Sequence, residues 1–357
     1  MEQFKKEQSM LDGMIDWVRA IDKNNTVFYA NKKMREDLGD DIVGAKCYEI
    51  FCRSKRCIDC IAKRTSNDGE VIKKETVYNG LTYMVISSPI LSEDGEILGS
   101  VEVFRDITNE KVLSKSLKEK NKKMRDDIAF ARNMQKRMLP SKGIFNGINI
   151  DYLYEPSEFL SGDFFDLFKL SDDLTGMYMC DVVGHGVSAS LLTMFVRQSL
   201  RNISKNNTKV DIILKELHKT FLALNLESDK YFSIFLAVYN NKTGELKYAN
   251  AGHNSIPILI RNSEIILLEA KGYPICNIFD SVDYDVDSVI LNEGDKLFLY
   301  TDGITETKNG DLVEFGIDKL IEIIKRENNI LSNIKTSLKQ YSHIQKDDYA
   351  VLMAEII

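Results

Sequence analysis

Four aspartates far apart in the chain stand where a strand is expected to end and the chain to turn. They are Asp163, Asp181, Asp302 and Asp347. Carboxylates held on rigid strand ends suit hard divalent cations, because Mg²⁺ and Mn²⁺ prefer oxygen ligands. Without a cation, converging carboxylates would repel one another and raise one another's pKa. Two bound ions would relieve this repulsion and could make a water nucleophilic near neutral pH, for an in-line displacement at phosphorus.

The residues around each aspartate support a strand end, although no single motif is specific. Asp163 follows Gly162, whose missing side chain allows close approach to the backbone. Asp181 ends an apolar run and enters a Gly-His-Gly turn, and Asp302 ends another run and is followed by glycine. An aspartate beside glycine is by itself most often a plain turn. The order and surroundings of the four motifs therefore matter more than any one of them.

Residues 148–357 contain many predicted strands in hairpin-like succession, with helices grouped in blocks. This pattern favours an α+β domain built on packed antiparallel sheets. The predicted strands are Ile148–Tyr154, Phe164–Lys169, Met177–Val183, Tyr231–Asn240, Glu245–Ala251, Ile256–Arg261, Lys296–Thr301 and Tyr349–Ala354, and the predicted helices are Ala189–Ile203, Val210–Asn225 and Ile317–Glu327.

Six short segments of this region carry a resemblance to a known family, in the family's order. They read ARNMQKRMLP, SGDFFDLFKL, CDVVGHGVSASLL, YANAGHN, LFLYTDGITET and DDYAVLM. Residues 128–357 thus resemble the bacterial metal-dependent serine/threonine protein phosphatases of the SpoIIE/RsbU type. The resemblance implies an αββα sandwich with two Mn²⁺ or Mg²⁺ ions at one end of its sheets. It also implies direct attack of water on phosphoserine or phosphothreonine, without a covalent phospho-enzyme.

The same resemblance implies roles for individual residues. Asp181 matches the aspartate that bridges the two ions, and the backbone carbonyl of Val182 would be a further ligand. His185 could protonate the leaving oxygen; the interpretation that we favour is that it only orients its turn. Asn250 and His253 belong to a family segment that we interpret as structural. The other matched ligands are Asp163, Asp302 and Asp347, with Asp348 as the substitute for Asp347 if the register is off by one.

Residues 17–107 show a different order of elements, with two strands, a helical stretch and three later strands. This order, with the segments AIDKNNTVFYAN and SEDGEILGSVEVFRDIT, resembles the PAS family of sensor domains. The predicted strands are Trp17–Asp22, Val27–Asn31, Glu70–Val77, Leu81–Pro89 and Gly95–Asp106, with a helix around Lys32–Leu38.

A long helix without glycine or proline is predicted over residues 109–138, and Pro140 ends it. Residues that step alternately by four and three along it form a weak coiled-coil seam, interrupted by two polar side chains. The seam predicts a parallel homodimer through residues 109–138, and the alternative is a helix packed on its own domain. The seam positions are Leu117, Asn121, Met124, Ile128, Ala131, Gln135 and Met138.

Four of the six cysteines crowd one stretch of the PAS-like region, at Cys47, Cys52, Cys57 and Cys60. Their spacing suits zinc or an iron–sulfur cluster. Redox-responsive thiols, or no special role, are the alternatives.

The bulk composition excludes several classes of protein. A net charge of -7 argues against a general nucleic-acid binder. No apolar run approaches the roughly 20 residues that cross a bilayer, and the first residues lead into no signal-peptide core. We therefore expect a cytoplasmic protein without nucleic-acid or membrane partners. A length of 357 residues suffices for two domains.

Together these features predict an α+β protein with a PAS domain over residues 10–108, a signalling helix over 109–140 and a phosphatase domain over 141–357. We expect the PAS unit to regulate a phosphatase that acts on a regulatory protein. The resemblance implies phosphorylated anti-sigma-factor antagonists of the STAS type as substrates. The alternative is a catalytically silent signalling adaptor on the same fold, with the cysteine-rich PAS unit as a redox or metal sensor.

Overall fold

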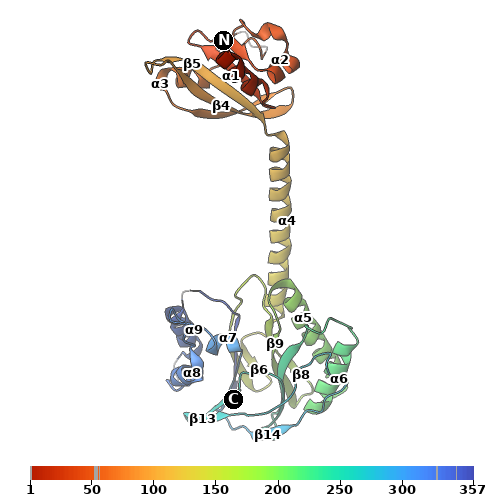
Figure 1. The fold of residues 1–357 in the computed structure, drawn as a ribbon. Helices are drawn as coiled ribbons and strands as arrows, with labels where there is room; N and C mark the ends of the chain where they lie inside the picture. Colours follow the sequence, from red (N-terminus) through yellow and green to blue (C-terminus); the bar gives the residue numbers. More distant parts are fainter. Residues whose placement is uncertain (1, 52–54, 56, 327–328, 343) are drawn as a thin grey trace. The chain divides into compact units, whose positions relative to one another are not determined.

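The computed structural model describes residues 2–51, 55, 57–326, 329–342 and 344–357 (Figure 1). The chain forms two compact units, residues 1–123 and 124–357. Helix α4 (Thr108–Met138) begins in the first unit and ends in the second. In the part of the chain that is described, no helix is both long enough and apolar enough to cross a bilayer.

The N-terminal unit is built on one antiparallel sheet of five strands in the order β2-β1-β5-β4-β3. The five strands and the helix predicted for this region are confirmed, and two further helices, α1 and α3, were not predicted. The elements are α1 (Glu2–Asp12), β1 (Trp17–Asp22), β2 (Val27–Ala30), α2 (Lys32–Leu38), the 3-10 helix η1 (Asp40–Ile42), α3 (Ile61–Asp68), β3 (Ile72–Tyr78), β4 (Leu81–Leu91) and β5 (Ile97–Asp106).

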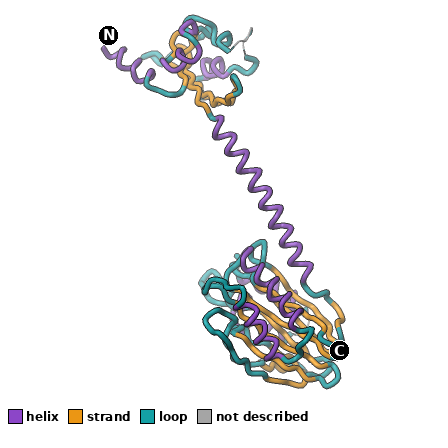
Figure 2. Tube along the Cα trace, turned by 90° about the vertical axis from the view of Figure 1, so that its right-hand side faces the viewer, coloured by secondary structure: helices purple, strands orange, loops and turns teal. Residues whose placement is uncertain are grey.

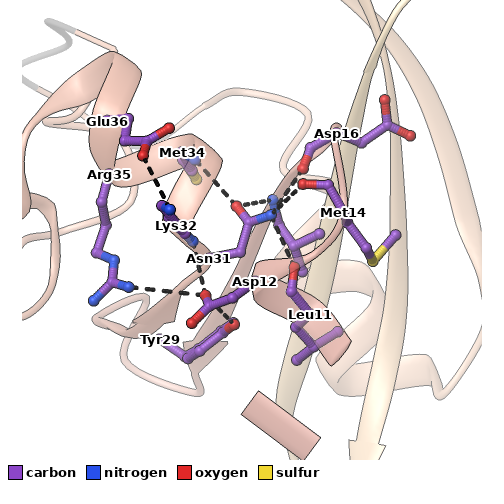
Figure 3. Close-up of polar contacts among 11 residues, drawn as sticks. Leu11, Asp12, Met14, Asp16, Tyr29, Asn31, Lys32, Met34, Arg35 and Glu36 are labelled. Atoms are coloured by element: carbon purple, nitrogen blue, oxygen red, sulfur yellow. Dashed lines mark hydrogen bonds and ion pairs between the residues drawn. The ribbon is translucent and has the colours of Figure 1, made fainter. Parts of the chain in front are cut away.

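Asn31 is a fully buried polar side chain that joins three parts of this unit (Figure 3). Its Nδ2 donates to three backbone carbonyls at the end of α1 and in the turn before β1, at 3.1, 3.3 and 2.9 Å. Its Oδ1 accepts from the backbone N–H of Val18 at 3.0 Å and from that of Met34 at 3.1 Å, and the second bond caps α2. The neighbouring Asp12 accepts from the Tyr29 hydroxyl at 3.1 Å. A single asparagine thus fixes where β1 and α2 begin.

The C-terminal unit contains two antiparallel sheets, of five strands in the order β14-β11-β10-β9-β8 and of six in the order β13-β12-β15-β16-β7-β6. All eight predicted strands and the three predicted helices are present. The elements after α4 are β6 (Gly143–Phe145), β7 (Ile148–Glu155), β8 (Asp163–Lys169), β9 (Leu174–Val182), α5 (Gly186–Ile203), α6 (Val210–Leu222), β10 (Phe232–Asn240), β11 (Glu245–Ala251), β12 (Ile258–Arg261), β13 (Glu264–Leu267), β14 (Asp287–Ile290), β15 (Lys296–Tyr300), α7 (Asp302–Thr305), α8 (Gly316–Ile324), α9 (Ile330–Tyr341) and β16 (Tyr349–Ile356).

The two sheets pack face to face, and helices cover both outer faces, so the predicted αββα sandwich is confirmed (Figures 1 and 2). Helices α5 and α6 bury the outer face of the five-stranded sheet, and α7 to α9 bury that of the six-stranded sheet. The strands alternate accordingly, as side chains with a period of two must. In β16, Ala350 and Leu352 point between the sheets, whereas Tyr349 and Val351 point to the outer helices.

The C-terminal end of α4 belongs to the fold of the second unit, which corrects the predicted seam. Gln135 is buried and Met138 packs on the core that α5 and α6 share with the five-stranded sheet. These two positions are therefore occupied by the helix's own domain. Earlier seam positions such as Leu117 and Met124 remain exposed.

Candidate metal centre

Asp163 and Asp181 lie directly opposite each other at one end of the five-stranded sheet, as register partners of β8 and β9. Both point toward the space between the sheets, because Phe165 and Met179, two residues away, line that inner face. Directly opposed residues of antiparallel strands have Cβ atoms about 4.5–5.5 Å apart. The fold therefore places two carboxylates side by side at the edge of the sandwich.

Gly162 allows the loop before Asp163 to approach β9. A Cβ on Gly162 would lie 2.9 Å from the carbonyl oxygens of both Val182 and Gly184, so no larger residue fits without a shift. The Val182 carbonyl, which was predicted as a ligand, thus borders this loop.

Asp302 and Asp347 come from the other sheet, at the end of β15 and just before β16. These strands pair antiparallel, with Tyr300 opposite Val351, so the two aspartates emerge at the same end. Gly303 packs against that junction, because a Cβ there would lie 2.1 Å from the Asp348 carbonyl oxygen and 3.2 Å from Cβ of Asp347. The close backbone contact brings the residue after Asp302 against Asp347.

Asp348 is an internal anchor of the loop that precedes Asp163. Its Oδ1 accepts from the N–H and the hydroxyl of Ser157, at 2.7 and 2.9 Å. Its Oδ2 accepts from the Ser161 hydroxyl at 2.7 Å and from the Gly162 N–H at 2.8 Å. A carboxylate has about four acceptor sites, and protein donors use all of them in Asp348. Asp347 is exposed and accepts one bond, from the Asp348 N–H at 2.8 Å, which leaves an oxygen for a ligand.

The proposed ligands lie close enough together that neighbouring carboxylates help to raise the pKa of three of them. Burial, followed by the charge of Asp181, raises the pKa of Asp163 well above its ordinary value. Burial, followed by the charges of Asp302 and Asp347, raises the pKa of Asp181 to about 7. Burial and the charge of Asp347 raise the pKa of Asp302 to about 6. Negative charge at this end of the sandwich is therefore costly unless a cation compensates it.

The chemistry of the donors fits Mg²⁺ or Mn²⁺, because the site offers carboxylate and carbonyl oxygens. The repulsion between buried carboxylates supplies a reason to bind a cation. Within the described residues, however, no three His, Cys, Asp or Glu side chains are grouped as the ligands of one ion. The ligand set of Asp163, Asp181, Asp302 and Asp347 therefore stays a prediction.

His185 lies at the entrance to α5 with an exposed imidazole. Its Nδ1 is 3.3 Å from Oε1 of Glu158, and 72% of the side chain is accessible. Glu158 belongs to the loop held by Asp348, so this contact orients the Gly-His-Gly turn against that loop. The geometry supports the structural interpretation of His185.

Asn250 and His253 connect the five-stranded sheet to the six-stranded sheet close to the strand end that precedes Asp302. Asn250 accepts from the His253 N–H at 2.7 Å and donates to the His253 and Ala270 carbonyls at 2.9 and 3.0 Å. Nε2 of the buried His253 lies 3.0 Å from the Tyr300 carbonyl oxygen, two residues before Asp302. This agrees with the structural role predicted for the segment, which fixes the strand end that carries Asp302.

The described cysteines of the N-terminal unit line one cavity of about 180 Å³, and Cys52 lies outside the described residues. Cys47 is buried, and burial raises the pKa of its thiol to about 11. Cys57 and Cys60 are half-buried. No cluster of three or more metal-binding side chains exists in the described part, so the expected zinc or iron–sulfur site has no support.

Several residues of the site were not predicted from the sequence. The serines of the Asp348 anchor, Ser157 and Ser161, are found only through their hydrogen bonds. The Thr301 hydroxyl contacts Asp163 from the other sheet and lowers the pKa that burial raises. The Ser161 hydroxyl bonds both Asp348 and the Asp163 N–H, which explains why serine suits this position.

Comparison with known proteins identifies both units. The profile of the family described as Stage II sporulation protein E (SpoIIE) matches residues 171–357, and a PAS domain profile matches residues 12–109. The chain is 26% identical over 237 residues to "Phosphoserine phosphatase RsbU" of Bacillus subtilis, a match that covers 64% of this chain and 70% of that protein. It is 27% identical over 241 residues to "Phosphoserine phosphatase RsbP" of the same organism, covering 64% of this chain and 58% of that protein.

A similar fold is found in the solved SiaA-PP2C domain of Pseudomonas aeruginosa. The TM-score is 0.56 at 22% identity, and the match covers 66% of this chain and 98% of that domain. Identity at this level shows the fold alone.

Proposed function

The chain belongs to the SpoIIE family, and on this premise we propose that it is a PAS-regulated protein phosphatase that removes phosphate from serine or threonine of a regulatory protein. The C-terminal domain is a metal-dependent serine/threonine phosphatase domain, as its family and PP2C-type fold indicate. The observation that carries the proposal is the pairing of Asp163 with Asp181 at the sheet end where Asp302 and Asp347 also emerge.

In this proposal Asp163, Asp181, Asp302 and Asp347 would hold two Mn²⁺ or Mg²⁺ ions, and the Val182 carbonyl would be a further ligand. When bound, such ions supply the Lewis acidity that makes water nucleophilic near neutral pH and stabilises charge on a phosphoryl group. Asp348 holds the loop that carries Asp163, through its hydrogen bonds to Ser157, Ser161 and Gly162. His253 and Thr301 hold the strand end that carries Asp302. His185 orients its turn.

The names of two relatives support phosphoserine as the substrate group, and the family resemblance supports the class of substrate protein. RsbU and RsbP are both described as phosphoserine phosphatases, and the present chain spans less than two thirds of RsbP. We propose a phosphoserine protein of the STAS type, an antagonist of an anti-sigma factor, as the substrate. The PAS unit would then set the phosphatase activity in response to a signal.

A direct test uses the full chain with a phosphoserine STAS protein and measures phosphate release with EDTA, Mg²⁺ or Mn²⁺. We expect release that requires a divalent ion and is lost in Asp181→Asn. No release from several such substrates with either metal, in wild type as in the variant, would defeat the proposal.

The alternative, a catalytically silent adaptor on the same fold, is disfavoured because all four proposed ligands are carboxylates. An adaptor would have no need to retain them at the site where they repel one another. Metal content after purification separates the two functions, because a silent adaptor would bind no stoichiometric Mn²⁺.

We further propose a parallel homodimer through the part of α4 that its own domain leaves uncovered. The seam positions Leu117 and Met124 are exposed along this stretch and lie seven residues apart, which is one heptad of a coiled coil. Sedimentation equilibrium of the full chain should give a dimer, and Leu117→Glu should shift it toward monomer. A wild-type monomer at micromolar concentration would refute the proposal.

A further inference from the structure

Helix α4 exposes apolar side chains and buries a polar one. All residues of α4 are described, and Gln135 alone is buried among them, with 2% of its surface accessible. Phe130 and Met134 nearby are exposed. Because a buried amide costs free energy unless it is hydrogen-bonded, the partners of Gln135 indicate what this helix end holds.

The Gln135 amide forms a closed pair of hydrogen bonds with the backbone of Ser161. Its Nε2 donates to the Ser161 carbonyl at 2.8 Å, and its Oε1 accepts from the Ser161 N–H at 3.1 Å. Nε2 also donates to the Thr193 hydroxyl of α5, at 3.3 Å. One side chain thus satisfies both backbone groups of a loop residue, as a neighbouring strand would do.

Ser161 in turn forms hydrogen bonds with two aspartates, Asp348 and Asp163. Its hydroxyl donates to Asp348 Oδ2 at 2.7 Å and accepts from the Asp163 N–H at 3.0 Å. Hydrogen bonds therefore run without a break from Gln135 through Ser161 to the carboxylate of Asp348 and the backbone of Asp163.

We propose that Gln135 is a positioning residue, through which the last turn of α4 sets the affinity of the metal centre. The inference rests on the proposed function, because it takes Asp163 to be a metal ligand. Residues that orient a ligand typically change metal affinity or activity by 10–100-fold when they are replaced. Gln135 acts one residue further from the ion, through Ser161, so we expect a loss of affinity of about tenfold.

The test compares Gln135→Met, which keeps the side-chain length and removes both hydrogen bonds, with Lys136→Ala as a control at an exposed position on the same turn. In the metal-free full chain, amide hydrogen exchange of residues 157–163 should be about ten times faster in Gln135→Met. Isothermal titration with Mn²⁺ should show about tenfold weaker binding. At saturating Mn²⁺, hydrolysis of p-nitrophenyl phosphate should return to within about twofold of wild type, and Lys136→Ala should match wild type throughout.

Failure of this inference is distinct from failure of the proposed function. If wild type neither binds Mn²⁺ nor hydrolyses p-nitrophenyl phosphate, the proposed function fails. If wild type does both and Gln135→Met keeps its loop exchange and Mn²⁺ affinity, the positioning role is overturned.

Ser161→Ala is the second variant, and it leaves α4 unchanged while removing the next link. Its Mn²⁺ affinity should fall to a similar extent. If Gln135→Met does not fold, Ser161→Ala alone tests whether the hydrogen bonds through Ser161 set the Mn²⁺ affinity. Wild-type affinity in Ser161→Ala would overturn the inference as well.

Discussion

Replacing Asp181 with Asn should stabilise the metal-free protein and abolish its response to Mn²⁺. Burial and the neighbouring aspartates raise the pKa of Asp181 from 3.8 to about 7. Above pH 7 its charged form therefore carries up to about 4 kcal/mol of unfavourable free energy in the folded state. Asn removes the charge but leaves a buried amide, so we expect a net gain of about 2 kcal/mol, or about 4–8 °C in Tm.

The dependence on pH has a definite sign. Because the folded-state pKa of Asp181 lies above the unfolded value, the folded protein binds more protons between the two. The stability of metal-free wild type should accordingly fall as pH rises from about 4 to about 7, and Asp181→Asn should lose this part of the slope. With Mn²⁺ at about 100 times its Kd, wild type should gain about 2.7 kcal/mol, so the order of stability of the two proteins reverses.

Differential scanning calorimetry in EDTA at several pH values measures the stability without metal, and the same scans with Mn²⁺ measure the stabilisation by the ion. The single tryptophan of the chain, Trp17, lies in the N-terminal unit, and its fluorescence follows that unit separately. Asp172→Asn is the control, because Asp172 lies in the turn at the other end of β8 and β9 with 93% of its side chain accessible. It should change stability by less than about 0.5 kcal/mol in either condition. If Asp181→Asn destabilises the metal-free protein, or keeps the wild-type Mn²⁺ shift, the carboxylate-repulsion argument is refuted.

Three other predictions concern the framework of the site. Asp348→Asn should cost about 2–4 kcal/mol in urea unfolding, because a carboxylate that accepts four hydrogen bonds is lost. Asp347→Asn should not lower the stability of the metal-free protein, since Asp347 is exposed and its charge raises the pKa of Asp181 and Asp302, but it should lose the Mn²⁺ shift. Equal losses of stability in the two variants would contradict the division of roles. Gly303→Ala should lower the free energy of unfolding by more than about 2 kcal/mol, since its Cβ would lie 2.1 Å from a backbone oxygen. Gly310→Ala is the control, and it should be tolerated because no atom lies within 4 Å of its Cβ. Similar melting temperatures for the two variants would show that the contact at Gly303 relaxes. Burial lowers the pKa of His253 from 6.5 to about 4. The stability that neutral His253 contributes is therefore full above pH 6.5 and is lost on acidification through pH 4, by up to about 3 kcal/mol. His253→Gln should lack this part of the pH dependence of unfolding, and parallel pH profiles of the variant and wild type would contradict the prediction.

Much of the fold was predictable because most strands are buried on alternating or on both faces. Helix α2 and strand β11 have the predicted bounds, Lys32–Leu38 and Glu245–Ala251. The missed strands β6, β13 and β14 have three or four residues, which is too few to show an alternation of apolar and polar side chains. Helix α9 was missed because its polar residues hide a narrow apolar stripe of Ile330, Ile334 and Leu338.

The acidic residues of the site were predictable, and their division of roles was not. Asp347 and Asp348 are identical side chains next to each other, and only the positions of the serine donors distinguish them. The helical repeat predicts the face of the helix on which Gln135 lies, but not whether that face packs on a second helix or on the loop of Ser161. A hydrogen bond between residues 26 positions apart has no signal in a single sequence.

The order in which the strands are made has a consequence for synthesis of the protein. Strand β16 lies in the middle of its sheet, between β15 and β7, yet it follows both in the chain. While the ribosome is still translating, the β6–β7 hairpin and the β12–β13–β15 group cannot join, and each presents an unpaired strand edge that favours aggregation. Asp347 lies just ahead of β16, so under the proposed function a nascent chain gains its full set of metal ligands only when that strand has closed the sheet.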